Sequence, residues 1–186
     1  PRTGRVAAAM TIVFPRTDVF DGVSWSAGEL ELVERQEMGG REANGAQPAV
    51  SYGSGLWRGT YVTDIMHNRQ AVDFQAVLNS LDGIIGSFEA WDMRRPGPRA
   101  YPDGSAGNGT LAAVNANNKA IALAGLNSGQ IVARGDYLSF TYKGNRALHQ
   151  AMETVAANSG GSTAQFEVRP HLRLGWTLDT AVNLKA

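Results

Sequence analysis

Few residues of this chain have the types and spacing that catalysis requires. Glu89 and Asp92 could be the paired carboxylates of a glycoside hydrolase, which must face one substrate. Because they are three residues apart on a predicted strand, they point to opposite faces of it. The sequence therefore predicts that Asp92 pairs with Arg94 or Arg95, or forms a turn.

The histidines and serines do not form a recognisable reactive pattern either. His67, His149 and His171 lie far apart without the spacing of zinc ligands, and the chain has no cysteine. Ser54 lies between two glycines, but a predicted strand follows it, so this segment is neither a phosphate loop nor a nucleophile elbow. We expect a linker or bulge at Ser54, and no catalytic residue, cofactor or metal ion.

The four tryptophans, Trp25, Trp57, Trp91 and Trp176, are spread over separate apolar segments. A solvent-facing aromatic row would indicate stacking on sugars or bases. Apolar neighbours favour core packing instead. An exposed Trp57 or Trp91 beside a carboxylate would indicate a carbohydrate-binding or hydrolytic domain, and this alternative stays open.

A stiff basic loop follows the segment Ile84–Trp91, whose apolar residues predict a short strand. The loop contains Arg94, Arg95 and Arg99, and two prolines interrupt it, each of which fixes the backbone and removes a hydrogen-bond donor. Guanidinium groups are planar forks that suit carboxylates. The loop is typical of a protein that contacts another subunit.

Composition limits the function classes further. The 186 residues hold 17 Lys and Arg against 17 Asp and Glu, which argues against a dedicated nucleic-acid binder. The 22 glycines indicate many turns. No apolar run is long enough for a membrane span, and the short apolar centre of residues 1–14 does not make a convincing signal peptide.

The elements expected around these residues are mostly strands. Period-two or β-branched patterns predict strands at residues 11–14, 30–33, 56–62, 111–114, 120–123, 137–142 and 164–168. Residues 69–81 predict one helix, with Asn68 as its N-cap, Gly83 after its end and an apolar stripe buried against a sheet. Residues 145–157 could be a helix or a strand, and we favour a strand in a hairpin across the turn at 158–161. Residues 39–48 predict a polar loop.

The order of these features resembles that of bacteriophage distal tail proteins, which form the ring between tail tube and tail tip. The resemblance covers about residues 56–173. It rests on the helix at 69–81, Leu81–Phe88, Asp92–Pro96, a Gly/Asn-rich insertion, Gly135–Phe140, the Asn-Ser-Gly-Gly turn and Phe166–Arg173.

The resemblance implies a mainly β fold: a split, tail-tube-like β-barrel with one packed helix. Residues 1–100 and 143–186 would form the ring domain, and residues 101–142 a small inserted β subdomain. It implies a structural virion protein, not an enzyme, made in the host cytoplasm and located at the phage tail tip. Its partners would be copies of itself in a ring, commonly a hexamer, the tail-tube protein and the tail hub or baseplate.

In this interpretation the loop at 39–48 and the basic loop contact neighbouring subunits. The candidate contact residues are Arg94, Arg95, Arg99, Arg41 and Glu42. The small insertion departs from larger family members with a C-terminal carbohydrate-binding domain. A tail-tube or other minor tail protein of the same fold, and more distantly a carbohydrate-binding β-domain, are the alternatives.

Overall fold

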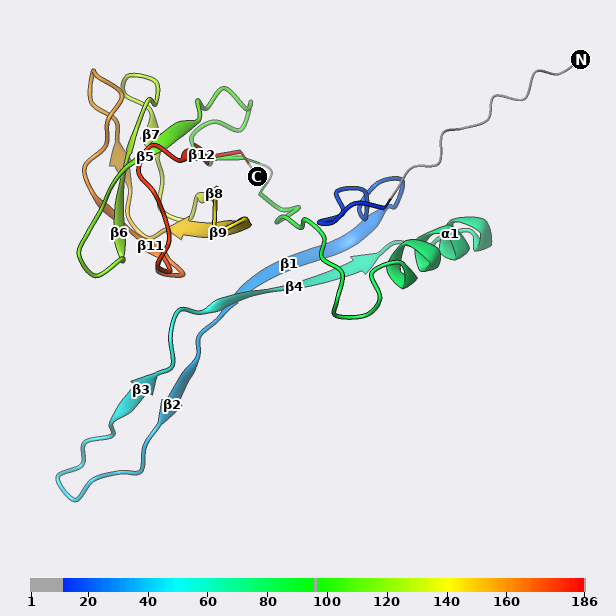
Figure 1. The fold of residues 1–186 in the computed structure, drawn as a ribbon, viewed down its shortest axis with the longest axis horizontal. Helices are drawn as coiled ribbons and strands as arrows, with labels where there is room; N and C mark the ends of the chain where they lie inside the picture. The colour runs from blue at the N-terminus through cyan, green and yellow to red at the C-terminus, as the bar shows by residue number, and fades with distance from the viewer. Residues whose placement is uncertain (1–11, 96, 186) are drawn as a thin grey trace, which may run out of the picture. The chain divides into compact units, whose positions relative to one another are not determined.

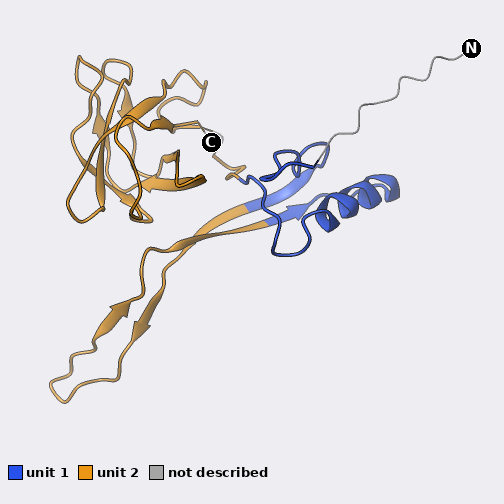
Figure 2. Ribbon diagram, in the orientation of Figure 1, with its two compact units in different colours: residues 1–28, 61–90 blue, residues 29–60, 91–186 orange. Residues whose placement is uncertain are grey.

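The computed structural model describes residues 12–95 and 97–185, and these are mainly β with one helix, as expected. The chain divides into two units, coloured separately in Figure 2. We call residues 12–28 and 61–90 the helical unit, and residues 29–60 and 91–185 the barrel unit. Figure 1 labels the elements. They are β1 (Trp25–Val33), β2 (Gln36–Met38), β3 (Ala49–Ser51), β4 (Leu56–Thr63), α1 (Asn68–Asn79), β5 (Gly109–Val114), β6 (Ala120–Ala124), β7 (Ile131–Val132), β8 (Tyr137–Tyr142), β9 (Asn145–Ala151), β10 (Val155–Ala156), β11 (Phe166–Arg169) and β12 (Ala181–Asn183).

Six antiparallel strands close into a barrel in the order β11-β6-β5-β12-β8-β9. Alternate residues of these strands point inward and form one apolar core, in which Leu111, Leu123, Leu138, Phe166 and Val182 are almost completely buried. Closure matters because a closed barrel has no free edge strand. The barrel therefore buries its apolar side chains and pairs its backbone N–H and C=O groups within one chain.

The strands predicted at 111–114, 120–123, 137–142 and 164–168 are confirmed as β5, β6, β8 and β11. Residues 145–151 form strand β9, which pairs with β8 and with β11. Lys143 and Gly144, both with positive φ, make the two-residue turn between β8 and β9, which matches the twist of an antiparallel hairpin. The choice of a strand over a helix is confirmed for residues 145–151. The predicted hairpin across the turn at 158–161 is confirmed only in that β9 pairs with β11, because β10, which directly precedes the turn, pairs with β7.

The predicted division of the chain at residues 101 and 142 is wrong. Strands from residues 101–142 alternate with strands from residues 143–186 around the same barrel, and all share one core. The three-residue strand β12, which was not predicted, lies between β5 and β8. The sequence segments 101–142 and 143–186 are thus parts of one structure, not an insertion and its host.

The predicted helix is confirmed as α1, with its N-cap one residue earlier than expected, at His67. The Gln70 side chain accepts a hydrogen bond from the His67 backbone N–H, at 3.2 Å. The prediction that the apolar stripe of this helix is buried is wrong, since none of its residues is buried. Phe74 packs edge-on to Trp25, with ring centroids 5.8 Å apart, within a small aromatic cluster. The other members of that cluster are Phe20, Tyr61 and Phe88.

Two predicted strands are absent from the described part of the chain. Residues 82–86 form turns instead of a strand, and Phe88 makes only an isolated bridge to Arg16. Ile84 is fully exposed and Ile85 is 80% exposed, so these apolar residues are not buried as those of a core strand would be. Residues 12–14 have no strand conformation, and residue 11 lies outside the described residues.

Residues 25–63 form a long two-stranded β-ribbon that turns back at the loop around residue 45. The predicted strands at 30–33 and 56–62 are confirmed within β1 and β4, which pair with each other. Beyond them β2 pairs with β3, so residues 36–38 and 49–51 extend the ribbon on both sides of the predicted loop at 39–48. We call residues 34–53, all of which are exposed, the arm.

Candidate functional site

Asp92 is the centre of the basic loop. Its side chain is fully buried and accepts hydrogen bonds from the backbone N–H and the guanidinium of Arg94, at 3.0 and 3.2 Å. The Tyr137 hydroxyl donates to the other carboxylate oxygen, at 3.3 Å. Burial alone raises the pKa of Asp92, yet hydrogen bonds and the charge of Arg94 outweigh it and leave this pKa below its ordinary value. The predicted pairing of Asp92 with Arg94 is confirmed.

The other two arginines of this loop also have contacts within the chain. Arg95 lies 4.0 Å from Asp92 and 5.7 Å from the centroid of the Tyr137 ring, and donates to the Gly135 carbonyl. Arg99 is held through its backbone N–H by Asp136. Arg94 and Arg95 nevertheless keep about half of their side-chain surface exposed. The loop is therefore anchored on the barrel while its guanidinium groups stay accessible, and the predicted subunit contact remains a prediction.

Arg41 and Glu42 lie elsewhere, at the tip of the arm. Backbone bonds between Glu42 and Ala46, and a side-chain bond from Asn44 to Glu42, close that tip. Among the residues that the structure describes, no hydrogen bond or ion pair joins this tip to the basic loop. The five predicted contact residues thus belong to two separate surfaces.

Both backbone edges of the arm are open. The Gly39 N–H donates to the Pro48 carbonyl, and the Tyr52 N–H donates to the Arg35 carbonyl. These two bonds determine which residues form hydrogen-bonded pairs across the ribbon. Because bonded and non-bonded pairs alternate in antiparallel ribbons, the N–H and C=O groups of alternate residues point outward. These residues are Gln36, Met38, Ala49 and Ser51. A two-stranded ribbon is marginally stable alone, and open edges are templates for further strands.

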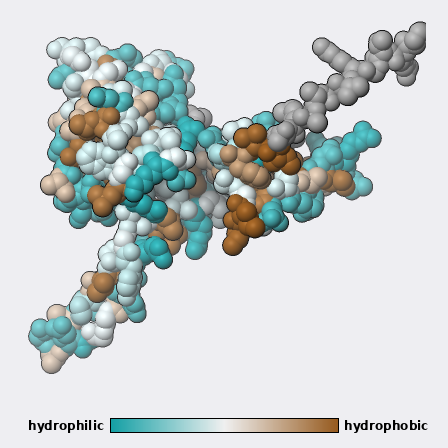
Figure 3. Space-filling model, viewed as in Figure 1, coloured by the Kyte–Doolittle hydropathy of each residue, from teal (hydrophilic) through white to brown (hydrophobic). Residues whose placement is uncertain are grey.

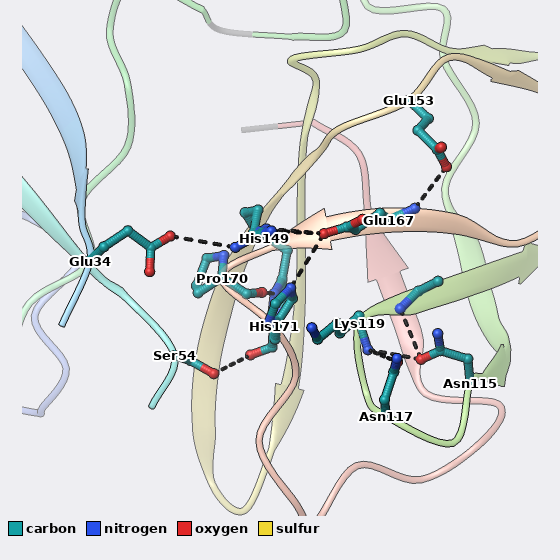
Figure 4. Close-up of polar contacts among 12 residues, drawn as sticks. Glu34, Ser54, Asn115, Asn117, Lys119, His149, Glu153, Glu167, Pro170 and His171 are labelled. Carbon is teal, nitrogen blue, oxygen red and sulfur yellow. Dashed lines mark hydrogen bonds and ion pairs between the residues drawn. The ribbon is translucent and has the colours of Figure 1, made fainter. Parts of the chain in front are cut away.

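The base of the arm is attached to the barrel by three polar contacts, two of which appear in Figure 4. Glu34 lies 3.7 Å from the guanidinium of Arg169, and the Ser54 hydroxyl donates to the His171 carbonyl at 3.0 Å. Trp57 donates its indole N–H to the Leu148 carbonyl at 2.7 Å. The predicted role of Ser54 as part of a linker agrees with this position between β3 and β4.

The helical unit carries a large exposed apolar surface, visible as brown areas in Figure 3. Only Val19, Phe20 and Leu81 are buried hydrophobic residues there. Its exposed large hydrophobic residues are Ile12, Val13, Phe14, Val62, Ile65, Val72, Leu78, Ile84, Ile85 and Phe88. A patch of this kind marks a binding surface more often than an ordinary solvent-facing one.

The barrel unit carries a cleft of about 390 Å³ with a basic rim, which we call the basic cleft. It is lined by residues of β4, of the β8–β9 hairpin and of the segment after β11. The lining includes Trp57, Tyr142, Lys143, Arg146, Arg173 and Leu174, and it includes no carboxylate. Sequence reasoning missed this cleft because its residues lie on three distant segments.

The three histidines have different partners, and two of them, His149 and His171, line the basic cleft. His67 caps α1, while the His149 Nδ1–H donates to the Pro170 carbonyl at 2.7 Å and His171 lies 3.4 Å from Glu167. Burial lowers the pKa of His149 to about 4, although its bond to Pro170 acts in the opposite direction. Within residues 12–95 and 97–185, no group of three or more His, Asp or Glu residues could hold a metal ion.

Three of the four tryptophans, Trp25, Trp57 and Trp176, pack as the sequence predicts. Trp25 belongs to the aromatic cluster, Trp57 lies edge-on to Tyr137 at 5.6 Å, and Trp176 packs against the barrel core. Glu89 and Asp92 do not occupy a strand, so the two-face argument does not apply to them.

Comparison of the sequence with models of known protein families and with curated proteins gives no match. In the described part of the chain, no helix has the length and apolar character needed to cross a membrane.

Proposed function

We propose that this chain is a structural protein that assembles with copies of itself into a ring at the distal end of a phage tail. It would join the tail tube to the tail tip or baseplate hub. The resemblance in motif order supports the phage assignment, and the mainly β fold with one helix is compatible with it. The proposal assigns no reaction to the chain.

The observation that carries the self-assembly proposal is the incomplete core of the helical unit. This unit buries three hydrophobic residues and exposes ten large ones. Burying apolar surface is the main favourable term in folding and in most protein association. A unit that cannot bury its own hydrophobic residues is expected to bury them against a partner.

The arm supports the same conclusion independently. All residues from 34 to 53 are exposed, yet they form a paired ribbon with outward-facing N–H and C=O groups on both sides. Strands from neighbouring copies would satisfy those groups. In a ring, one surface of each copy binds a different surface of the next copy, and such heterologous contacts can close into a ring.

The mass and shape of the purified chain in solution test this proposal. Light scattering with negative-stain imaging is expected to give one closed ring of discrete size. Long tubes would favour the tail-tube alternative. A compact monomer at every concentration would contradict self-assembly and bring back the carbohydrate-binding alternative, which a glycan-binding assay then tests.

A matched pair of variants makes the test specific. Ile65 is 98% exposed on the helical unit, whereas Leu178 is 52% exposed on the barrel. Ile65→Asp is expected to abolish assembly, and Leu178→Asp to leave it unchanged. Loss of assembly in both variants, or in neither, would contradict a role for the helical unit's apolar surface.

A further inference from the structure

The charges of this neutral chain are unevenly distributed. Residues 12–28 and 61–90 hold two arginines and six acidic residues, a net charge of −4. The barrel unit holds 13 basic and 11 acidic residues, a net charge of +2, and its residues 91–185 alone hold ten and six, a net charge of +4. Opposite net charges on two surfaces steer copies of a protein toward head-to-tail encounter.

One segment of the helical unit combines acidic and apolar character in a protruding shape. We call Asp82–Gly86 the isoleucine turn. Asp82 and Gly83 have positive φ, and the Gly86 N–H donates to the Leu81 carbonyl at 2.7 Å. A Cβ on residue 86 would lie 2.5 Å from that carbonyl oxygen, so only glycine lets the turn close. The turn is therefore a defined structure, and it holds Ile84 and Ile85 in solvent.

The basic cleft has the complementary character. Lys143 and Arg173 are on its lining, and within the described chain neither has a carboxylate partner. Leu56, Trp57 and Leu174 give it apolar surface, and Leu174 is 72% exposed. A ligand that fits these groups presents a carboxylate beside aliphatic side chains.

We infer that the isoleucine turn of one copy binds in the basic cleft of the next copy. Asp82 would face Lys143 and Arg173, and Ile84 and Ile85 would lie against Trp57 and Leu174. The two surfaces differ, so the contact is heterologous and generates a ring or an open helix according to the rotation between copies. This inference rests on the proposed self-assembly and names the surfaces that would carry it.

Disulfide trapping tests the contact directly, because the chain has no cysteine of its own. Ile84→Cys and Leu174→Cys chains, one of them carrying a size tag, are mixed and mildly oxidised. The inference predicts a cross-linked heterodimer. Ile84→Cys mixed with Leu178→Cys is the control, since Leu178 is exposed on the barrel but does not line the cleft. A heterodimer yield no higher than the control overturns the inference.

A charge variant tests the ionic part of the contact. Asp82→Asn removes the charge and keeps a residue that tolerates positive φ. It is expected to weaken association about five-fold, as one partly exposed ion pair would. Asp73→Asn makes the same charge change on α1, away from the turn, and is expected to change association less than two-fold. Equal effects of the two variants would contradict a specific role for Asp82.

The outcomes separate this inference from the proposed function. If the wild-type chain forms rings but the Ile84→Cys and Leu174→Cys chains do not cross-link above control, the inference fails and the proposed function stands. If the wild-type chain stays monomeric and the Ile84→Cys and Leu174→Cys chains do not cross-link above control, both fail. Selective cross-linking of chains that stay monomeric supports the contact and contradicts a stable ring.

Discussion

The barrel and the helical unit differ in how completely each buries its own hydrophobic residues. The barrel closes its sheet and buries a continuous core from Leu111 to Leu184. The helical unit has an aromatic cluster, one helix without a buried residue and a row of exposed isoleucines and valines. Substitutions in the barrel should therefore change the stability of the monomer, and substitutions in the helical unit should change association.

The largest effect is expected for Phe166→Ala. Phe166 is almost fully buried in the barrel core, and truncating a buried phenylalanine costs about 3–5 kcal/mol of unfolding free energy. Ile85→Ala, at a site 80% exposed, is expected to change the stability of the monomer by less than about 0.5 kcal/mol and to weaken assembly. Urea denaturation measures the first effect, and light scattering the second. A monomer equally destabilised by both variants would remove the distinction between the two regions.

His149 should make the barrel sensitive to acid. Its pKa is about 4 in the folded protein, well below the ordinary value of 6.5, because burial disfavours the charged ring. Between these pH values the unfolded chain binds more protons than the folded chain, so the free energy of unfolding falls as the pH falls from 6.5 to 4. The full difference is about 3 kcal/mol.

Denaturation at a series of pH values checks this effect. His149→Leu removes the titrating group and also the bond to Pro170, so its stability at pH 7 is expected to be lower. Its stability should, however, change much less between pH 6.5 and pH 4. An unchanged pH dependence in that range would show that another group is responsible.

The basic loop should affect stability and assembly together. Replacing Arg94 and Arg95 by Glu removes the two cationic partners of buried Asp92, leaves its bonds to Tyr137 and to the backbone N–H of residue 94, and places two further carboxylates beside it. We expect a loss of about 2 kcal/mol in unfolding free energy. Arg99→Glu is the matched variant, because Asp136 binds the Arg99 backbone, and the exposed Arg99 side chain makes one long hydrogen bond, at 3.4 Å to the Arg134 carbonyl. It should keep the stability of the monomer, so a change in assembly on this variant reports a subunit contact.

The sequence was most informative where local patterns decide the structure. The helix at 68–79 and strands such as Tyr137–Tyr142 follow from periodicity, and the pairing of Asp92 with Arg94 spans only two residues. The bond from Tyr137 to Asp92 joins residues 45 positions apart, and no local pattern specifies it.

Two errors had the same physical origin. The strand predicted at Ile84 and Ile85 and the predicted packing of α1 on a sheet both require apolar residues to be buried within one chain, whereas none of these residues is buried. The sequence does not predict strands β2 and β3, because every residue of both is exposed. Strands without a buried face have no alternation of apolar and polar residues that would reveal them. The barrel was predictable because it is self-contained, and the helical unit and the arm were not.

The smallest effect on the monomer is expected in the arm. The Ser51 N–H points away from β2, so Ser51→Pro removes an outward donor without removing a bond inside the ribbon. The unfolding free energy should change by less than about 0.5 kcal/mol, because the arm makes no contribution to the barrel core. Ser51→Ala keeps the N–H and is the control for the lost hydroxyl, which bonds to the Gly53 carbonyl.

If strands of neighbouring copies add to this edge, Ser51→Pro weakens ring formation in light scattering and Ser51→Ala does not. Val50→Pro removes an inward donor and should also disrupt the ribbon itself, which increased proteolysis of the arm would report. Normal assembly of Ser51→Pro would exclude the β3 edge as an assembly surface and leave the apolar surface of the helical unit to hold the copies together.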